Sequence, residues 1–357
     1  STITAVQTLM SGGNAIDAAI AAVATQCVVE PQSTGIGGDM FCLYKPHDGD
    51  IVGFNGSGRA PAAATADWFA EQGITEIGRD SPHSVTIPGS IDGWSKLIEA
   101  HGTKSLGDML QPAIRFAHNG FPMHHCSHLD WSLMEEILCK DPTGASQYFP
   151  QGKVPDIGSV VTLPLLAKTL EHIAEKGRSG FYEGWVAEDI VSFLQGIGGL
   201  QTMEDFANFE GTFVTPIKTN YKGYEVWECP PNGQGIVALE MLNILGGMGL
   251  DQLDPLSTER LHIEIEAARL AYRDRDAVLA DPDNSDIPVE RWLSEEHASS
   301  QRELIDRNKR MEPLSASELP NHRDTVYITI VDKNRNAVSI INTNFYLFGS
   351  ARVAPKS

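Results

Sequence analysis

The feature that most constrains the fold is an alanine-rich segment at residues 14–24. Asn14 is a suitable N-cap for a helix, and Asp17 falls in the first turn, where the helix dipole favours a carboxylate. Because apolar side chains surround this helix on nearly all sides, we expect it to be buried. Its side chains are also small, which allows close packing. The segment therefore predicts a buried helix that lies closely against a sheet.

Strand patterns occur towards both ends of the chain, and helical patterns lie between them. Residues 40–54 predict two short strands, and helical periodicity dominates from about 90 to 210. Two further helices are expected near 236–245 and 257–279, followed by a polar surface segment at 285–322. This order does not fit a parallel series of alternating strands and helices. It predicts an α+β architecture.

A β-hairpin is predicted at residues 325–343. Residues 325–331 are dense in β-branched side chains, and after a polar turn the chain returns as a second strand that ends at Thr343. An odd number of unpaired turn residues would place Thr343 diagonally across from Thr325 on the same face. An even number would place Asn344 there instead. Either arrangement gives Thr325 a polar neighbour.

Charge and hydropathy exclude several classes of partner. The formal net charge is −20, from 47 acidic and 27 basic side chains. Binding to nucleic acid or to an anionic membrane surface needs a basic footprint, so neither partner is expected. No stretch approaches eighteen consecutive apolar residues, which excludes a membrane-spanning helix.

The five cysteines bear on the cellular compartment. They are scattered without regular spacing, which does not resemble a disulfide framework and favours reduced thiols in the cytoplasm. The chain begins at Ser1 and shows no signal peptide, so a periplasmic or secreted location stays the alternative.

Familiar cofactor and metal motifs are absent from the sequence. The glycine-rich stretch at 35–38 lacks the dinucleotide-binding spacing, because Met40 occupies the place of the third glycine; tight backbone packing is the favoured interpretation. Residues 124–128 hold four potential metal ligands, but no distant partner is evident, so exposed loop histidines are expected. No Gly-x-Ser-x-Gly motif occurs. We therefore expect no cofactor and no metal.

Short motifs follow one another in a particular order along the whole chain. They are Gly12 to Ala19, Val28 to Pro31, Ser33 to Gly38, Ala60-Pro61, Val85 with Pro88-Gly89, His101 to Thr103, Pro112 to Ile114, Phe181 to Gly184, Pro230 to Asn232, Thr325 with Val331-Asp332, Asn336 to Val338 and Phe348-Gly349. Each motif is weak alone. In this order and spacing, the chain resembles the γ-glutamyltranspeptidase family over nearly its whole length.

The resemblance implies an αββα sandwich of the N-terminal-nucleophile hydrolase type, made as a precursor. Cleavage between Asp324 and Thr325 would give a large subunit, residues 1–324, and the start of a small subunit, residues 325–357, which pair as a heterodimer. The rest of the small subunit, with the glycine pair that forms the family's oxyanion hole, is expected to lie beyond this chain.

The resemblance also implies a mechanism. Thr325 would be the nucleophile, its freed α-amine, with a pKa near 8, would be the base, and Thr343 would hydrogen-bond the nucleophile. The substrate would be a γ-glutamyl amide similar to glutathione, or a related amide. The acyl group would pass from an acyl-enzyme to water or to an amine.

The chain departs from the family pattern at several positions. Ser57 stands where the family has an arginine that binds the substrate carboxylate, and Arg59 lies two residues further on, on the same face of a strand; Arg59 is therefore the candidate substrate-binding residue. Val326 and Tyr327 replace the usual Thr-His, and Phe345 replaces an asparagine. These changes leave two alternatives open: an acylase for other amides, such as cephalosporin side chains, and an inactive homologue with a binding or structural role.

Overall fold

The computed structural model describes residues 1–312 and 325–357 of the chain, which fold into two units. Of these residues, the first unit comprises 1–50, 54–212 and 325–357, and the second comprises 51–53 and 213–312. The family resemblance implies a different division, into subunits of residues 1–324 and 325–357 that are separated by cleavage of one peptide bond. This division stays a prediction. Residues 325–357 belong to the first unit, because this C-terminal segment folds together with the N-terminal one.

The first unit combines helices with short strands. Its helices are α1 (Thr2–Met10), α2 (Ala15–Val29), α3 (Ala66–Glu71), α4 (Ser90–His101), α5 (Leu106–Asn119), α6 (His125–Leu138), α7 (Pro142–Tyr148), α8 (Pro164–Lys176), α9 (Ser179–Tyr182), α10 (Gly184–Gly196) and α11 (Met203–Ala207), with a 3₁₀ turn at Pro82–Ser84. Its strands are β1 (Asp39–Lys45), β3 (Phe121–Pro122), β4 (Val160–Val161), β8 (Val326–Val331) and β9 (Ala337–Thr343). Strands β2 (Val52–Gly56) and β5 (Thr212–Val214) lie where the chain passes between the units.

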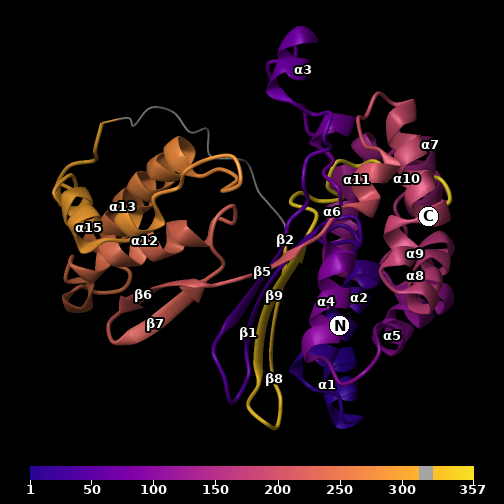
Figure 1. The fold of residues 1–357 in the computed structure, drawn as a ribbon, viewed down its shortest axis with the longest axis horizontal. Coiled ribbons are helices and arrows are strands. Elements are labelled where there is room, and N and C mark those ends of the chain that lie inside the picture. Colours follow the sequence, from indigo (N-terminus) through magenta and orange to yellow (C-terminus); the bar gives the residue numbers. More distant parts are fainter. Residues whose placement is uncertain (313–324) are drawn as a thin grey trace. The chain divides into compact units, whose positions relative to one another are not determined.

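The main sheet has five strands in the order β5-β2-β1-β9-β8. Strand β9 runs antiparallel to both β1 and β8, so the C-terminal hairpin completes a sheet begun near the N-terminus. Helices α2 and α4 pack against one face of these strands (Figure 1). Helix α5 covers α2 on its other side, and α8 packs on α5. The predicted α+β class is confirmed.

Helix α2 is the centre of the first unit, and the expectation that it is buried is confirmed. Every residue from Ala15 to Val28 is buried. The side chain of Asn14 accepts a hydrogen bond from the Asp17 amide, and Asp17 accepts one from the Asn14 amide in return. The buried Asp17 carboxylate also accepts the amides of Thr103 (2.9 Å) and Lys104 (3.1 Å), so it joins the start of α2 to the chain after α4.

The predicted hairpin is also confirmed. Val326 pairs with Asn342 and Val331 with Ala337, which leaves the five residues 332–336 in the turn, an odd number. Continuing this register by one position sets Thr325 directly opposite Thr343, where the sequence had predicted a diagonal position. The turn is tied to α2, because the Asp332 carboxylate accepts the amide of Ala15 at 3.1 Å.

The second unit is a small helical layer on a two-stranded sheet. It contains β6 (Ile217–Tyr221), β7 (Tyr224–Glu228), α12 (Gly235–Gly246), α13 (Thr258–Val278), α14 (Val289–Trp292) and α15 (Glu295–Arg302), with a 3₁₀ turn at Leu250–Gln252. The strands pair antiparallel, and α12 packs on both strands and on α13 and α15. Helices α12 and α13 confirm two sequence predictions.

The prediction of a plain surface segment at residues 285–322 is wrong in its first part. Helices α14 and α15 form there, and Trp292, Ala298 and Gln301 are buried. These side chains are too few and too widely spaced to give a clear helical pattern among polar neighbours. Within the described residues, no helix is long and apolar enough to cross a membrane.

Candidate active site

The hairpin brings the hydroxyl groups of Thr325 and Thr343 together. Their Oγ1 atoms lie 3.0 Å apart, at hydrogen-bonding distance. The Thr343 oxygen also accepts the Phe345 amide at 2.9 Å. A hydroxyl has one proton and two acceptor positions, so Thr343 can accept from Phe345 and still donate to Thr325. The side chain of Thr325 is solvent-exposed. Its predicted partner in cleavage, Asp324, lies outside the described residues.

The end of β9 is held in place by a buried asparagine that the sequence did not single out. The Asn342 amide group donates to Thr34 Oγ1 (2.8 Å) and to the Gly35 carbonyl (3.1 Å). Its Oδ1 accepts the indole N–H of Trp94 at 3.2 Å. A buried amide with satisfied donors and acceptor fixes its surroundings strongly. Asn342 thereby sets the position of the neighbouring Thr343.

The glycine-rich stretch has the packing role that the sequence predicted. A Cβ atom on Gly38 would lie 2.1 Å from the Thr343 carbonyl oxygen, and one on Gly35 would lie 2.9 Å from the Asn344 side chain. By contrast, a Cβ on Gly37 would meet nothing within 4 Å. Residues 35 and 38 are therefore glycines because the Asn344 side chain lies against both of them and the Thr343 carbonyl lies against Gly38.

A cavity of about 430 Å³ opens beside Thr343. The glycine loop and Asp39 form one part of its wall, and Asn344 lies next to Thr343. The remaining wall is mainly apolar and aromatic, with contributions from Tyr148, Leu166, Phe181, Val186, Ile190, Phe193, Phe345 and Phe348. The cavity therefore combines one polar edge, at Asp39, Thr343 and Asn344, with a large apolar surface.

Asp39 is the acidic side chain in the wall of this cavity. It faces Thr343 across the β1–β9 pair, and its Oδ1 accepts the Gly58 amide at 2.9 Å. Burial raises the pKa of the Asp39 carboxyl to about 6. The carboxylate is therefore charged at neutral pH and can attract a cationic group into the cavity. The sequence signal was an aspartate directly after the Gly37-Gly38 pair.

The predicted substrate-binding residue Arg59 is not among the residues that line the cavity beside Thr343. Arg59 is exposed, its carbonyl accepts the Ile87 amide at 2.9 Å, and it lines a separate cavity with Asp205 and Asn208. Within the described residues, the arginine that lines the Thr343 cavity is Arg352. Arg59 as the residue that binds a carboxylate stays a prediction.

The loop after Thr343 is held in an unusual conformation. Phe345 and Phe348 have φ angles of 71° and 55°, in the left-handed region that side chains other than glycine rarely adopt. The Arg79 guanidinium donates to the carbonyl oxygens of Leu347 and Gly349 and lies 4.8 Å from the centre of the Tyr346 ring. These contacts hold the strained loop at the mouth of the cavity.

The histidines at residues 124–128 have separate partners. His124 Nε2 lies 2.8 Å from Ser127 Oγ, while His128 Nδ1 lies 3.0 Å from the Pro155 carbonyl oxygen. Both lie at the start of α6, where the His124 ring also caps the helix. We expected exposed loop histidines: His124 and His125 are exposed, whereas His128 is half-buried within α6.

Comparison with known proteins supports one family. A family model described as gamma-glutamyltranspeptidase matches residues 1–357. The glutathione hydrolase-like YwrD proenzyme of Bacillus subtilis strain 168 is 39% identical over 350 residues, covering 97% of this chain and 65% of that protein. The glutathione hydrolase proenzyme of Escherichia coli strain K12 is 33% identical over 365 residues, covering 99% of this chain and 62% of that protein.

The fold is also similar to that of a solved structure. The crystal structure of cephalosporin acylase from Bacillus halodurans superposes with a TM-score of 0.91 at 36% sequence identity, covering 99% of this chain and 65% of that chain. The chain thus spans less than two thirds of the length of these relatives.

Proposed function

The chain belongs to the γ-glutamyltranspeptidase family, and on this premise we propose that it is an N-terminal-nucleophile amidohydrolase that acts on γ-glutamyl amides similar to glutathione. Thr325 is the nucleophile, and it becomes an N-terminal residue when the precursor is cut between Asp324 and Thr325. The observation that supports this most is the 3.0 Å contact between the Thr325 and Thr343 hydroxyls, beside a cavity of substrate size.

Cleavage and catalysis use the same hydroxyl group. In the uncut chain, the Thr325 oxygen attacks the Asp324 carbonyl carbon, the C–N bond breaks, and water hydrolyses the resulting ester. The freed α-amine has a pKa near 8, so it is largely protonated at pH 7, and its neutral fraction can take a proton from the Thr325 hydroxyl. Thr343 donates a hydrogen bond to the Thr325 oxygen and stabilises its developing negative charge.

The catalytic cycle transfers one acyl group. The Thr325 oxygen forms a bond to the substrate carbonyl carbon, the amide C–N bond breaks, and the amine leaves with the proton taken from Thr325. Water or an acceptor amine then attacks the ester carbonyl carbon, the ester C–O bond breaks, and the proton lost by the attacking group passes to the Thr325 oxygen. The small subunit that begins at Thr325 stays associated with the large one, because β9 pairs with β1 and both strands of the hairpin pack on α2.

Charged groups near the cavity suit a γ-glutamyl substrate. The Asp39 carboxylate can bind the α-ammonium group of the glutamyl moiety. An arginine is needed for its α-carboxylate, for which Arg352 in the cavity wall and Arg59 are the two candidates.

A second candidate function is that of an acylase for other amides, including cephalosporin side chains. The apolar wall and the ring of Phe345, where the family has an asparagine, favour an acyl group with an apolar portion. The structural similarity to a cephalosporin acylase agrees with this alternative.

Turnover of two substrates separates these functions. We expect the wild-type protein to hydrolyse a chromogenic γ-glutamyl anilide faster than a cephalosporin bearing an acyl side chain, and Thr325→Ala to hydrolyse neither. Thr325→Ser, which keeps a hydroxyl, should retain measurable turnover. A higher rate on the cephalosporin would establish the acylase function. A wild-type chain that neither cuts itself nor turns over either substrate would support the remaining alternative, an inactive homologue with a binding or structural role.

A further inference from the structure

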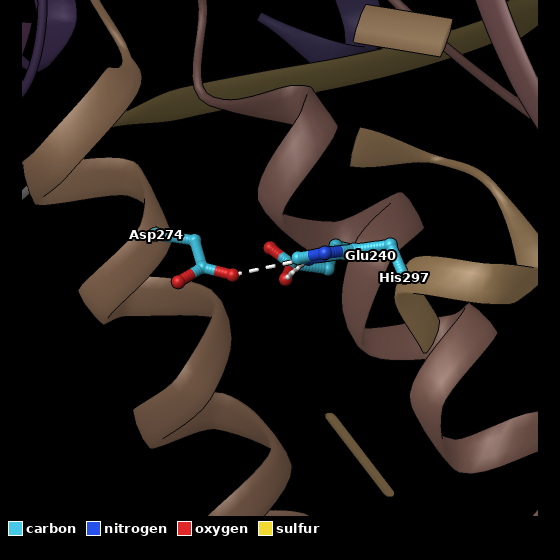
Figure 2. A group of neighbouring side chains, drawn as sticks. All are labelled: Glu240, Asp274 and His297. Carbon is cyan, nitrogen blue, oxygen red and sulfur yellow. Dashed lines mark hydrogen bonds and ion pairs between the residues drawn. The ribbon is translucent and has the colours of Figure 1, made fainter. Parts of the chain in front are cut away.

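Three side chains of the second unit converge at a point outside the threonine site. Glu240 comes from α12, Asp274 from α13 and His297 from α15. Figure 2 shows one end of the His297 ring pointing toward both carboxylates, with Nε2 at 3.1 Å from Glu240 Oε1 and 3.1 Å from Asp274 Oδ2. Among the described residues, this is the group of His, Cys, Asp and Glu side chains whose ligand atoms all lie within 4.8 Å of one another.

The spacing of these atoms fits a small cation. Zinc is usually bound by nitrogen and oxygen ligands at about 2.0–2.2 Å in a tetrahedral arrangement, which places neighbouring ligand atoms roughly 3.3 Å apart. The two distances from His297 Nε2 are 3.1 Å. Two of the three separations are therefore close to what a tetrahedral ion requires, and all three ligand atoms lie within 4.8 Å of one another.

Each carboxylate is oriented by a further donor. The Trp292 indole N–H donates to Glu240 Oε2 at 2.6 Å, and the Arg273 guanidinium lies 2.6 Å from Asp274 Oδ1. In both residues the other oxygen is the one that faces His297. Outer donors of this kind fix metal ligands in place and are typical of metal sites.

Burial makes a cation favourable at this point. The Glu240 side chain is fully buried, while Asp274 and His297 are 14% and 22% exposed. Buried carboxylates are costly unless a cation or several hydrogen bonds compensate for the lost water. The partly exposed pair leaves a route by which an ion can enter. The His118–Glu171 pair of the first unit differs, because both side chains are about half exposed and no third ligand joins them within the described residues.

We propose that Glu240, Asp274 and His297 bind a divalent transition-metal ion, with Zn²⁺ as the ion to test. An imidazole nitrogen with two carboxylate oxygens suits Zn²⁺ better than Mg²⁺ or Ca²⁺, which prefer oxygen ligands alone. The ion takes the place of the proton on His297 Nε2, which is released to water, and a water molecule completes its coordination.

The role of the ion is to hold the second unit together. Each ligand lies on a different helix, so the ion links α12, α13 and α15, and it adds to the apolar contacts of Trp292 and its neighbours that hold the segment with α14 and α15. An ion that binds only the folded state raises the unfolding temperature. The site contains no part of the threonine pair, so its occupancy does not depend on Thr325.

The test is calorimetric titration of Zn²⁺ into the full chain after treatment with a chelator and its removal. We expect one equivalent of Zn²⁺ to bind and to raise the unfolding temperature. His297→Ala should abolish binding, and Glu240→Gln, which keeps the shape and the Trp292 bond, should weaken it at least about 10-fold. His118→Ala, in the exposed histidine–carboxylate pair, and Thr325→Ala should bind as wild-type does.

Two results would overturn the proposal. One is a wild-type chain that binds no stoichiometric Zn²⁺. The other is a His297→Ala or Glu240→Gln protein that binds it as tightly as wild-type. Circular dichroism of each metal-free variant checks that it is folded. Where a variant fails to fold, Co²⁺ added to the wild-type protein decides: the intense visible absorption of a four-coordinate ion supports the site, and the weak spectrum of hydrated Co²⁺ contradicts it.

Discussion

The threonine hairpin and the three-ligand cluster show two ways in which a chain assembles reactive groups. Thr325 and Thr343 are 18 residues apart and meet because strand register and turn length put them opposite each other. Glu240, Asp274 and His297 are spread over three helices and meet only through helix packing. The first arrangement can be worked out from local rules, whereas the second requires the folded unit. The two sites also use different chemistry, so changes at one should leave the other intact.

The largest expected effect comes from Thr343→Val, which keeps the β-branched shape and removes the hydroxyl. Loss of the hydrogen bond to Thr325 should lower the rates of self-cleavage and of amide hydrolysis by about 100-fold. Rates are measured by gel densitometry and with the chromogenic anilide. Thr329→Val, an exposed threonine in the middle of β8, is the matched control and should change neither rate measurably.

The next largest effect is expected at the glycine loop. Gly38→Ala places a methyl group against the Thr343 carbonyl, so the loop or the strand must shift, at a cost of about 1–3 kcal/mol in the free energy of unfolding. Gly37→Ala has open space and should stay within about 0.5 kcal/mol of wild-type. Denaturant unfolding measures both. Equal stability of the two variants would contradict the close packing described for Gly38.

In the second unit, Trp292→Phe tests whether the proposed metal site can be weakened without affecting the threonine site. The phenyl ring keeps most of the apolar contact but removes the N–H that orients Glu240. Zn²⁺ affinity should fall about 10-fold, while self-cleavage at Thr325 continues at the wild-type rate. Calorimetry and gel analysis of the same preparation give both values. A loss of cleavage in this variant would show that the two sites are coupled.

The smallest effect is expected from Asp39→Asn and depends on pH. Burial raises the pKa of Asp39 from 3.8 to about 6, so between these pH values the folded state holds a proton that the unfolded state has released. This contribution to stability is complete below the unfolded pKa of 3.8 and is lost as pH rises through about 6. At pH 7.5 the variant should therefore be more stable than wild-type, by on the order of 1 kcal/mol, and the difference should vanish near pH 4. Thermal unfolding at the two pH values measures it.

Much of the threonine site could be predicted from sequence, because its parts are local. The apolar helix at residues 14–24 had to be buried, and the β-branched run at 325–331 had to form a strand. The family resemblance, now confirmed over residues 1–357, is the source of the roles that we propose for the two threonines. The glycine stretch was interpreted correctly as close packing because its spacing excluded a nucleotide-binding loop.

The remaining features depend on contacts between distant segments. Asn342 and Asp39 have no motif of their own; the first acquires its role from Thr34, Gly35 and Trp94, and the second from Thr343 and Gly58. Because residues 285–322 were interpreted as a surface segment, α15 was not predicted, and His297 was not recognised as a candidate ligand. The three proposed metal ligands are unequally spaced in the sequence and give no periodic signal. Their proximity follows only from the packing of helices α12, α13 and α15.

The central claim, that Thr325 becomes an N-terminal nucleophile, is tested most directly by mass spectrometry of the purified protein. We expect a C-terminal fragment that begins at Thr325, and its mass should increase by one acyl group, carried on Thr325, when a slowly hydrolysed γ-glutamyl substrate is added. A chain that stays uncut, a fragment that begins at another residue, or an acyl group on a side chain other than Thr325 would contradict the account.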